Sequence, residues 1–118
     1  MGASNESQAV VVEKRRFVRY EVDARVEYVV AGQRQAHPTE DLGAGGCRLT
    51  VGRLIEKGTV LEVRLTSSIC AVVVSGRATV VWASRTEPFQ VGLQFSDEVA
   101  EQAIGFIHAV LGAVAIRT

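Results

Sequence analysis

The feature that most constrains the fold is a strict two-residue alternation between Tyr20 and Val30. The charged residues stand at odd positions, namely Glu21, Asp23, Arg25 and Glu27, and every even position is apolar or small. Successive side chains of a β-strand point to opposite faces of a sheet, so this pattern predicts a strand with one face in a core and the other in solvent. The sequence Ala31-Gly32-Gln33 then predicts a turn.

Three further stretches have the character of strands. Leu61, Val63 and Leu65 alternate with polar residues, and Val91, Leu93 and Phe95 share one face of a last strand. Residues 69–84 are rich in β-branched side chains and are interrupted at Ser75-Gly76, which predicts one long bent strand or two strands with a bulge at the glycine. Short strands separated by turn residues favour an antiparallel barrel or sandwich.

A helix is predicted after Ser96, where the apolar period changes from two to 3.6. Ser96 is a suitable N-cap, and Asp97 and Glu98 suit the positive first turn of a helix that we expect over residues 97–114. Gly105 and Gly112 each cost about 1 kcal/mol of helix propensity, so packing against the barrel, a partner or both must hold the helix. The apolar face comprises Val99, Ala103, Phe106, Ile107, Val110, Leu111 and Val114.

Composition indicates one globular domain with a single core, because 47% of the 118 residues are hydrophobic and 22% are charged. Thirteen basic residues balance thirteen acidic ones, so no overall field attracts nucleic acid or an anionic membrane. Against this neutral background, Lys14, Arg15, Arg16 and Arg19 gather four positive charges within six residues. Any anion site must therefore be local, and this cluster is the first candidate.

The remaining features indicate a soluble cytoplasmic protein without a metal centre. Cys47 and Cys70 are isolated from each other and from histidines at metal-ligand spacing, which favours free thiols. Residues 1–13 show no signal-peptide pattern and are expected to form a mobile arm ahead of a domain over residues 14–118, with the barrel over about 20–96. The apolar stretch Ala103–Ile116 is too short to span a bilayer.

Two segments carry the residues of a binding site. Arg15 and Arg19 form an Arg-x-x-x-Arg motif, and Asp41–Gly46 contains three glycines and one carboxylate. Arginine guanidinium groups pair with phosphates and stack on purine faces, and an aspartate accepts hydrogen bonds from a guanine edge. Glycine lets the backbone approach a ligand closely. This combination favours a phosphorylated guanine ligand over a bare anion.

The chain resembles the PilZ domain family, the bacterial receptor module for cyclic di-GMP. That family has Arg-x-x-x-Arg ahead of its first barrel strand and Asp/Asn-x-Ser-x-x-Gly in a later turn. Arg15 and Arg19 match the first motif, and Asp41 and Gly46 match the ends of the second. Two further segments, Val80–Ser84 and Gln90–Phe95, resemble the penultimate and last strands of the family, so that the similarity covers about residues 13–96.

The resemblance implies a mainly β fold, a six-stranded antiparallel Greek-key-like barrel with a C-terminal helix, and no catalysis or cofactor. It implies that Arg15 and Arg19 hold the phosphates and guanine faces of cyclic di-GMP, with Arg16 as an auxiliary phosphate contact. It also implies that Asp41 reads a guanine edge and that the backbone near Gly46 allows close approach. Binding would order the N-terminal arm and change a surface that contacts another protein.

The family's serine position holds Gly43 in this chain. Loss of a hydroxyl contact costs about 1 kcal/mol, and ordering the glycine-rich run adds to it, so we expect an affinity roughly ten to a few hundred times weaker. The alternative is a degenerate PilZ-like module that does not bind the nucleotide and regulates motility or type IV pilus machinery through protein contacts. The C-terminal helix is also a candidate surface for homodimerisation.

Simpler interpretations remain open for each feature. The three arginines can form a solvated arm, Asp41 can bond to its own turn, and the glycines can serve a tight turn alone. A nucleic-acid-binding barrel would need a basic face with exposed aromatics, which the sequence does not indicate. Neither the two histidines nor Ser67-Ser68 belongs to an enzyme motif. The larger aromatic residues are expected in the core or at its edge: Tyr20, Tyr28 and Trp82.

Overall fold

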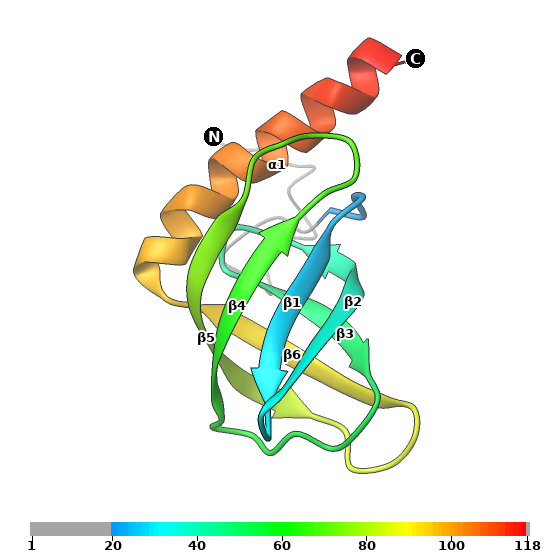
Figure 1. The fold of residues 1–118 in the computed structure, drawn as a ribbon, viewed down its shortest axis with the longest axis vertical. Coiled ribbons are helices and arrows are strands. Elements are labelled where there is room, and N and C mark those ends of the chain that lie inside the picture. Colours follow the sequence, from blue (N-terminus) through cyan, green and yellow to red (C-terminus); the bar gives the residue numbers. More distant parts are fainter. Residues whose placement is uncertain (1–19, 118) are drawn as a thin grey trace, which may run out of the picture.

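The computed structural model describes residues 20–117, which form a closed six-stranded antiparallel barrel followed by one helix (Figure 1). This confirms the predicted fold class. Around the barrel the strands follow the order β1-β2-β3-β6-β5-β4. Their bounds are Arg25–Val30 for β1, Gln33–Leu42 for β2, Gly46–Val51 for β3, Val60–Thr66 for β4, Val74–Ala83 for β5 and Phe89–Phe95 for β6, and the helix α1 covers Asp97–Arg117.

The alternation at residues 20–30 produces β1 with the predicted residues facing inward, although the strand is shorter than the predicted segment. Ala24, Val26 and Tyr28 are buried in the barrel, which confirms the inward face and the core position of Tyr28. The chain bends at Asp23, so the ladder of β1 begins only at Arg25. Tyr20 makes a separate bridge to Leu42 at the end of β2 and packs against the core while partly exposed.

The structure corrects the prediction for residues 69–84. A single strand, β5, covers only residues 74–83, and its register shift lies between Val80 and Trp82 instead of at Gly76. The shift leaves two consecutive side chains, Val81 and Trp82, outside the barrel, and Trp82 is 47% exposed. The prediction of Trp82 in the core or at its edge was therefore wrong, because a bulge interrupts the two-residue alternation of β5 and turns this side chain outward.

Helix α1 packs against β5 and β6, and its buried side chains join the core of the barrel (Figure 1). Its barrel-facing residues Val99, Ala103, Phe106, Ile107 and Val110 are buried. The Ser96 hydroxyl accepts a hydrogen bond from the backbone N–H of residue 99 at 3.4 Å, which confirms the predicted N-cap. The helix extends beyond residue 114, the predicted end, and its last turns project past the strands.

The close packing of α1 against β5 depends on Gly76. A Cβ atom at Gly76 would lie 2.3 Å from Cγ2 of Val99, far inside normal contact distance. Because Val99 is completely buried in the first turn of α1, the absence of a side chain at Gly76 is what lets the helix begin close to the sheet. This role explains the glycine that the sequence suggested as a bulge.

Two polar atoms in the barrel interior lack a hydrogen-bond partner among the described residues, Tyr28 Oη and His37 Nε2. Their rings are 5.8 Å apart between centroids. Burial raises the pKa of Tyr28, an effect that the charge of Arg53 partly offsets. Burial and the charge of Arg25 lower the pKa of His37, so the neutral form of that ring is favoured.

Replacing Tyr28 by phenylalanine is expected to increase the free energy of unfolding by about 1 kcal/mol, because it removes a buried hydroxyl that forms no bond in the barrel. Urea unfolding monitored by circular dichroism measures the change. Tyr20→Phe, at a partly exposed ring, is the control and is expected to change stability by less than about 0.5 kcal/mol. Destabilisation of the Tyr28→Phe variant would show that the hydroxyl has a partner.

Candidate functional site

Tyr20, the residue that follows the arginine motif in the sequence, pairs with Leu42 at one end of β2. The backbone N–H of Tyr20 donates to the carbonyl oxygen of Leu42 at 2.7 Å, and the N–H of Leu42 donates back to Tyr20 at 2.8 Å. Arg15, Arg16 and Arg19 lie outside the described residues. The arginine motif nevertheless ends one residue before Tyr20 in the sequence, and Leu42 lies between Asp41 and Gly43.

The second motif spans the hairpin between β2 and β3. Asp41 belongs to the end of β2 and Gly46 begins β3, so only residues 43–45 form the turn. The N–H of Gly43 donates to the carbonyl of Gly46 at 2.9 Å, and the carbonyl of Gly45 accepts from the N–H of Phe95 at 2.9 Å. The first bond closes the glycine-rich turn, and the second holds the turn against the end of β6.

Gly46 is required by the fold. A Cβ atom there would lie 1.9 Å from the carbonyl oxygen of Leu93 and 3.3 Å from the Cα of Gln94, both in the backbone of β6. Backbone atoms in a paired strand cannot move aside as a flexible side chain can. The close approach that the sequence suggested for a ligand is therefore made in this structure by the neighbouring strand.

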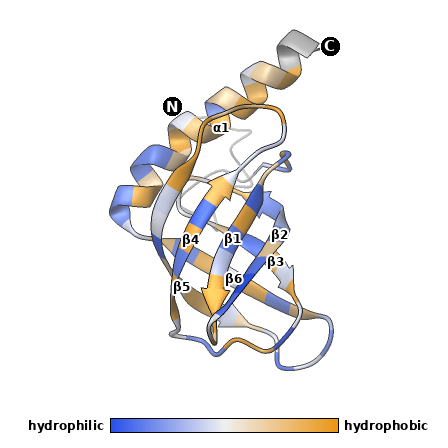
Figure 2. Ribbon diagram, viewed as in Figure 1, coloured by the Kyte–Doolittle hydropathy of each residue, from blue (hydrophilic) through white to orange (hydrophobic). Residues whose placement is uncertain are grey.

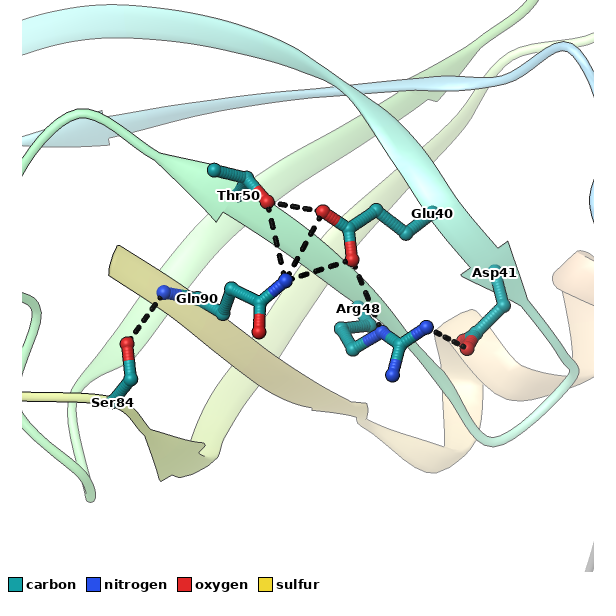
Figure 3. A network of polar contacts seen from close by, with 6 residues as sticks. All are labelled: Glu40, Asp41, Arg48, Thr50, Ser84 and Gln90. Carbon is teal, nitrogen blue, oxygen red and sulfur yellow. Dashed lines mark hydrogen bonds and ion pairs between the residues drawn. The ribbon is translucent and has the colours of Figure 1, made fainter. Parts of the chain in front are cut away.

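Asp41 is held in an ion pair with Arg48 of β3 (Figure 3). The Arg48 Nη2 atom lies 3.4 Å from Asp41 Oδ2, and Asp41 and Arg48 face each other in the β2–β3 register. The Asp41 side chain is only 13% exposed, whereas that of Arg48 is 46% exposed. A half-exposed cation thus stands beside the motif carboxylate.

A polar network extends from Arg48 along the outer face of the sheet (Figure 3). Arg48 Nε lies 3.2 Å from Glu40 Oε1. Glu40 also accepts hydrogen bonds from the Thr50 hydroxyl and from the Gln90 side-chain amide, and the backbone N–H of Gln90 donates to the Ser84 hydroxyl. The network connects β2, β3 and β6 and limits the positions that the Arg48 guanidinium can adopt.

The sequence motifs did not include Arg48, although hairpin geometry points to it. In an antiparallel hairpin whose strands pair Leu42 with Cys47, the residues one step outward, Asp41 and Arg48, face each other. The alternation of buried Cys47 and Leu49 with exposed Arg48 also places the arginine on the outer face. A register argument applied to residues 41–48 would have found this pair.

Among the described residues the site supplies a carboxylate, a guanidinium group and a tight glycine-rich turn. No three histidine, cysteine, aspartate or glutamate residues in this part of the chain are grouped as they would be to hold a metal ion. Within residues 20–117, no helix is long and apolar enough to cross a membrane. The groups present can bind an anion and a hydrogen-bond donor side by side.

Comparison with known proteins identifies the family. The PilZ domain family matches residues 13–111, which include both motifs and all six strands. The chain belongs to the PilZ domain family. PilZ domains are binding and regulatory domains, not enzymes. No curated protein sequence matches the chain significantly.

Three solved structures show the same fold as this PilZ domain at low sequence identity. The PilZ domain of YcgR from Escherichia coli, solved with c-di-GMP, superposes with a TM-score of 0.67 and 13% identity over 89% of this chain and 97% of that chain. MotI/DgrA, an inhibitor of motility from Bacillus subtilis, gives a TM-score of 0.66 and 14% identity over 87% of this chain. The PilZ domain of CeSA from a cellulose-synthesizing bacterium gives 0.55 and 18% identity over 80% of this chain and 96% of that chain. The present chain spans 51% of the MotI/DgrA chain, about half its length.

Proposed function

We propose that this PilZ domain is a cytoplasmic receptor for cyclic di-GMP. The observation that carries the proposal is the bridge between Tyr20 and Leu42, since Tyr20 directly follows the arginine motif and Leu42 lies between Asp41 and Gly43. The two motifs are far apart in sequence, and this contact at Tyr20 supports a shared site. Membership of the family and the c-di-GMP complex of the YcgR PilZ domain support the choice of ligand.

In the proposed complex, Arg15 and Arg19 bind the phosphates and stack on the guanine faces, and Arg16 adds a phosphate contact. Asp41 accepts hydrogen bonds from a guanine edge, and the turn from Gly43 to Gly45 leaves the ligand room to approach. The ligand is a dianion, so a cationic segment beside a tight turn suits it electrostatically. Binding orders the segment before Tyr20 and so changes the surface presented to a protein partner of the motility or type IV pilus machinery.

Calorimetric titration of the full chain with cyclic di-GMP tests the proposal, with GTP as the control. Saturable binding of cyclic di-GMP but not of GTP is expected, and the stoichiometry distinguishes one bound ligand from a stacked pair. If millimolar cyclic di-GMP produces no heat of binding, the receptor function is refuted. The alternative would then hold, a PilZ-like module that acts through protein contacts without the nucleotide.

Gly43→Ser is expected to increase the affinity for cyclic di-GMP about tenfold, because it restores the family's hydroxyl and stiffens the glycine-rich turn. The same titration measures the change. Ser68→Gly is the control, because it makes the reverse substitution in the loop between β4 and β5. It is expected to leave the affinity for cyclic di-GMP unchanged. Equal affinity for the Gly43→Ser and unmodified proteins would show that the hydroxyl makes no contact here.

Arg48→Ala is expected to weaken cyclic di-GMP binding about fivefold, because it removes a cation near a dianionic ligand and releases the Asp41 carboxylate from its orientation. Arg64→Ala is the matched control, since Arg64 is equally exposed and also ion-paired, with Glu27 at 3.5 Å on the β1–β4 face. Titration of both variants provides the comparison. Tighter binding by Arg48→Ala would mean that Arg48 competes with the ligand for Asp41.

A further inference from the structure

The outward side of α1 is unusual because it has no charged residue over four turns. Between Glu101 and Arg117 the sequence contains no aspartate, glutamate, lysine or arginine. A helix on a protein surface normally presents charged side chains to solvent. Figure 2 shows hydrophilic colouring in the first turns of α1 and white to hydrophobic colouring beyond them. The exposed positions described here are Gln102, Ile104, Gly105, His108, Leu111, Gly112 and Val114.

Aliphatic residues form a regular seam along the helix, in which Ile107 is buried against the barrel and three members are exposed. Ala100, Ile104, Ile107, Leu111 and Val114 follow one another at alternating intervals of four and three residues. This spacing is the heptad pattern by which one helix packs along another. The side chains of Ile104, Leu111 and Val114 are 48%, 39% and 43% exposed, so the barrel of the same chain leaves much of the seam uncovered.

Two glycines beside this seam have no packing role within the described part of the chain. A Cβ atom at Gly105 or Gly112 would meet no atom within 4 Å, so alanine would fit at either position and favour the helix. Both glycines lie on the exposed side of the helix, seven residues apart, with exposed His108 between them. Small residues at such places let the backbone of a second helix approach closely.

We propose that this face of α1 pairs with the same face of α1 in a second copy of the chain, with the helices antiparallel about a two-fold axis. The distribution of charge selects this arrangement. Asp97, Glu98 and Glu101 make the start of the helix acidic, and the next charged residue is Arg117 at its end. A parallel pair would place the two acidic starts together, whereas an antiparallel pair places each beside the basic end of the partner helix.

The same chemistry disfavours a membrane as the occupant of this face. Helices that lie on membranes carry lysine and arginine along their polar side, which attract anionic lipid headgroups. The uncharged side of α1 has none between residues 101 and 117. A second copy, by contrast, supplies both a matching apolar seam and the opposite charge. The pairing does not depend on nucleotide binding.

Sedimentation equilibrium of the full chain without nucleotide tests the proposal over micromolar concentrations. A monomer–dimer equilibrium is expected. The double substitution Ile104→Glu with Leu111→Glu should raise the dimer dissociation constant at least about 100-fold, because it places four carboxylates in the seam of a dimer. The control pair Val29→Glu with Val60→Glu, at exposed valines of β1 and β4, should leave the constant unchanged.

A second variant separates association from folding. Gly105→Ala should raise the melting temperature of the dilute monomer, because alanine favours helix where nothing opposes its side chain. The same substitution should raise the dimer dissociation constant about tenfold by holding the paired backbones apart. A merely structural role of the helix would not make the monomer more stable and the dimer weaker at the same time.

Cysteine cross-linking tests the orientation in a Cys70→Ser background, with Cys47 buried. A mixture of Glu101→Cys and Val114→Cys chains should cross-link through a short bis-maleimide, while neither variant should do so alone. Cross-linking of each variant alone would overturn the antiparallel arrangement. A monomer at every concentration would overturn the pairing itself. If the chain is a monomer and the Ile104→Glu, Leu111→Glu protein is less stable, another segment of the same chain covers this face of α1. If the monomer binds lipid vesicles, a membrane covers it.

Discussion

Replacing Arg15 and Arg19 together by alanine should lower the affinity for cyclic di-GMP by about 100-fold to 10,000-fold, since each charge-assisted contact contributes roughly 1.5–3 kcal/mol. The fold of residues 20–117 should be unaffected, because both arginines precede the barrel in the sequence. Calorimetric titration measures the affinity, and thermal unfolding checks the fold.

The matched control for this pair is Arg34→Ala with Arg85→Ala. It changes the net charge by the same amount and removes two exposed arginines, whose side chains are 72% and 69% exposed. Arg34 lies at the opposite end of β2 from Leu42, and Arg85 lies in the loop before β6. The control should change affinity less than about twofold, through screened long-range charge alone. Unchanged binding by the Arg15/Arg19 variant would refute the assigned site. Equal losses of affinity in both variants would show that the arginines act only through the net charge of the protein.

Lysine at the same two positions tests how the arginines act. Lysine keeps the positive charge but lacks the planar guanidinium group that binds a phosphate through two parallel bonds and stacks on a base. The Arg15→Lys, Arg19→Lys protein should therefore bind about 10-fold to 100-fold more weakly than the unmodified chain. Full affinity in the lysine variant would show that charge alone attracts the ligand.

Three of the strands that the sequence predicted have one face in the core and the other in solvent. In β1, β4 and β6 the alternation survives in the burial of the side chains, and α1 follows its apolar period from Val99 to Val110, beyond which the predicted face is exposed at Leu111 and Val114. Strand β2 has no such pattern, because most of its side chains are partly exposed and Pro38 lies within it. Its place is set by pairing with β1 across the turn at Ala31-Gly32, which is a tertiary relation.

The candidate site shows the same division between local pattern and register. Motif spacing was enough to select Asp41 and Gly46, and it gave no role to Arg48, which contacts Asp41 only because β2 and β3 pair. The predicted position of Trp82 was wrong for a related reason, because the bulge after Val80 changes the face of the sheet on which the later residues of β5 lie. Local patterns determine which face a side chain prefers, and strand register determines which side chains meet.

Gly46→Ala is expected to lower the free energy of unfolding by about 3 kcal/mol or more, because the new methyl group would overlap the carbonyl oxygen of Leu93. Relief requires β3 and β6 to separate where residues 46–51 pair with residues 89–94. The hydrogen bond from Phe95 to Gly45 would be disturbed by the same movement. Urea unfolding measures the loss.

Gly52→Ala is the control for backbone entropy, because a Cβ atom there meets nothing within 4 Å and the residue follows β3 directly. It should change stability by less than about 0.5 kcal/mol. A loss below about 1 kcal/mol in Gly46→Ala would show that the strands can separate locally at little cost. With the expected loss, failure of a Gly46 variant to bind cyclic di-GMP would report a damaged barrel, and the ligand contacts would have to be mapped through Asp41, Gly43 and the arginines instead.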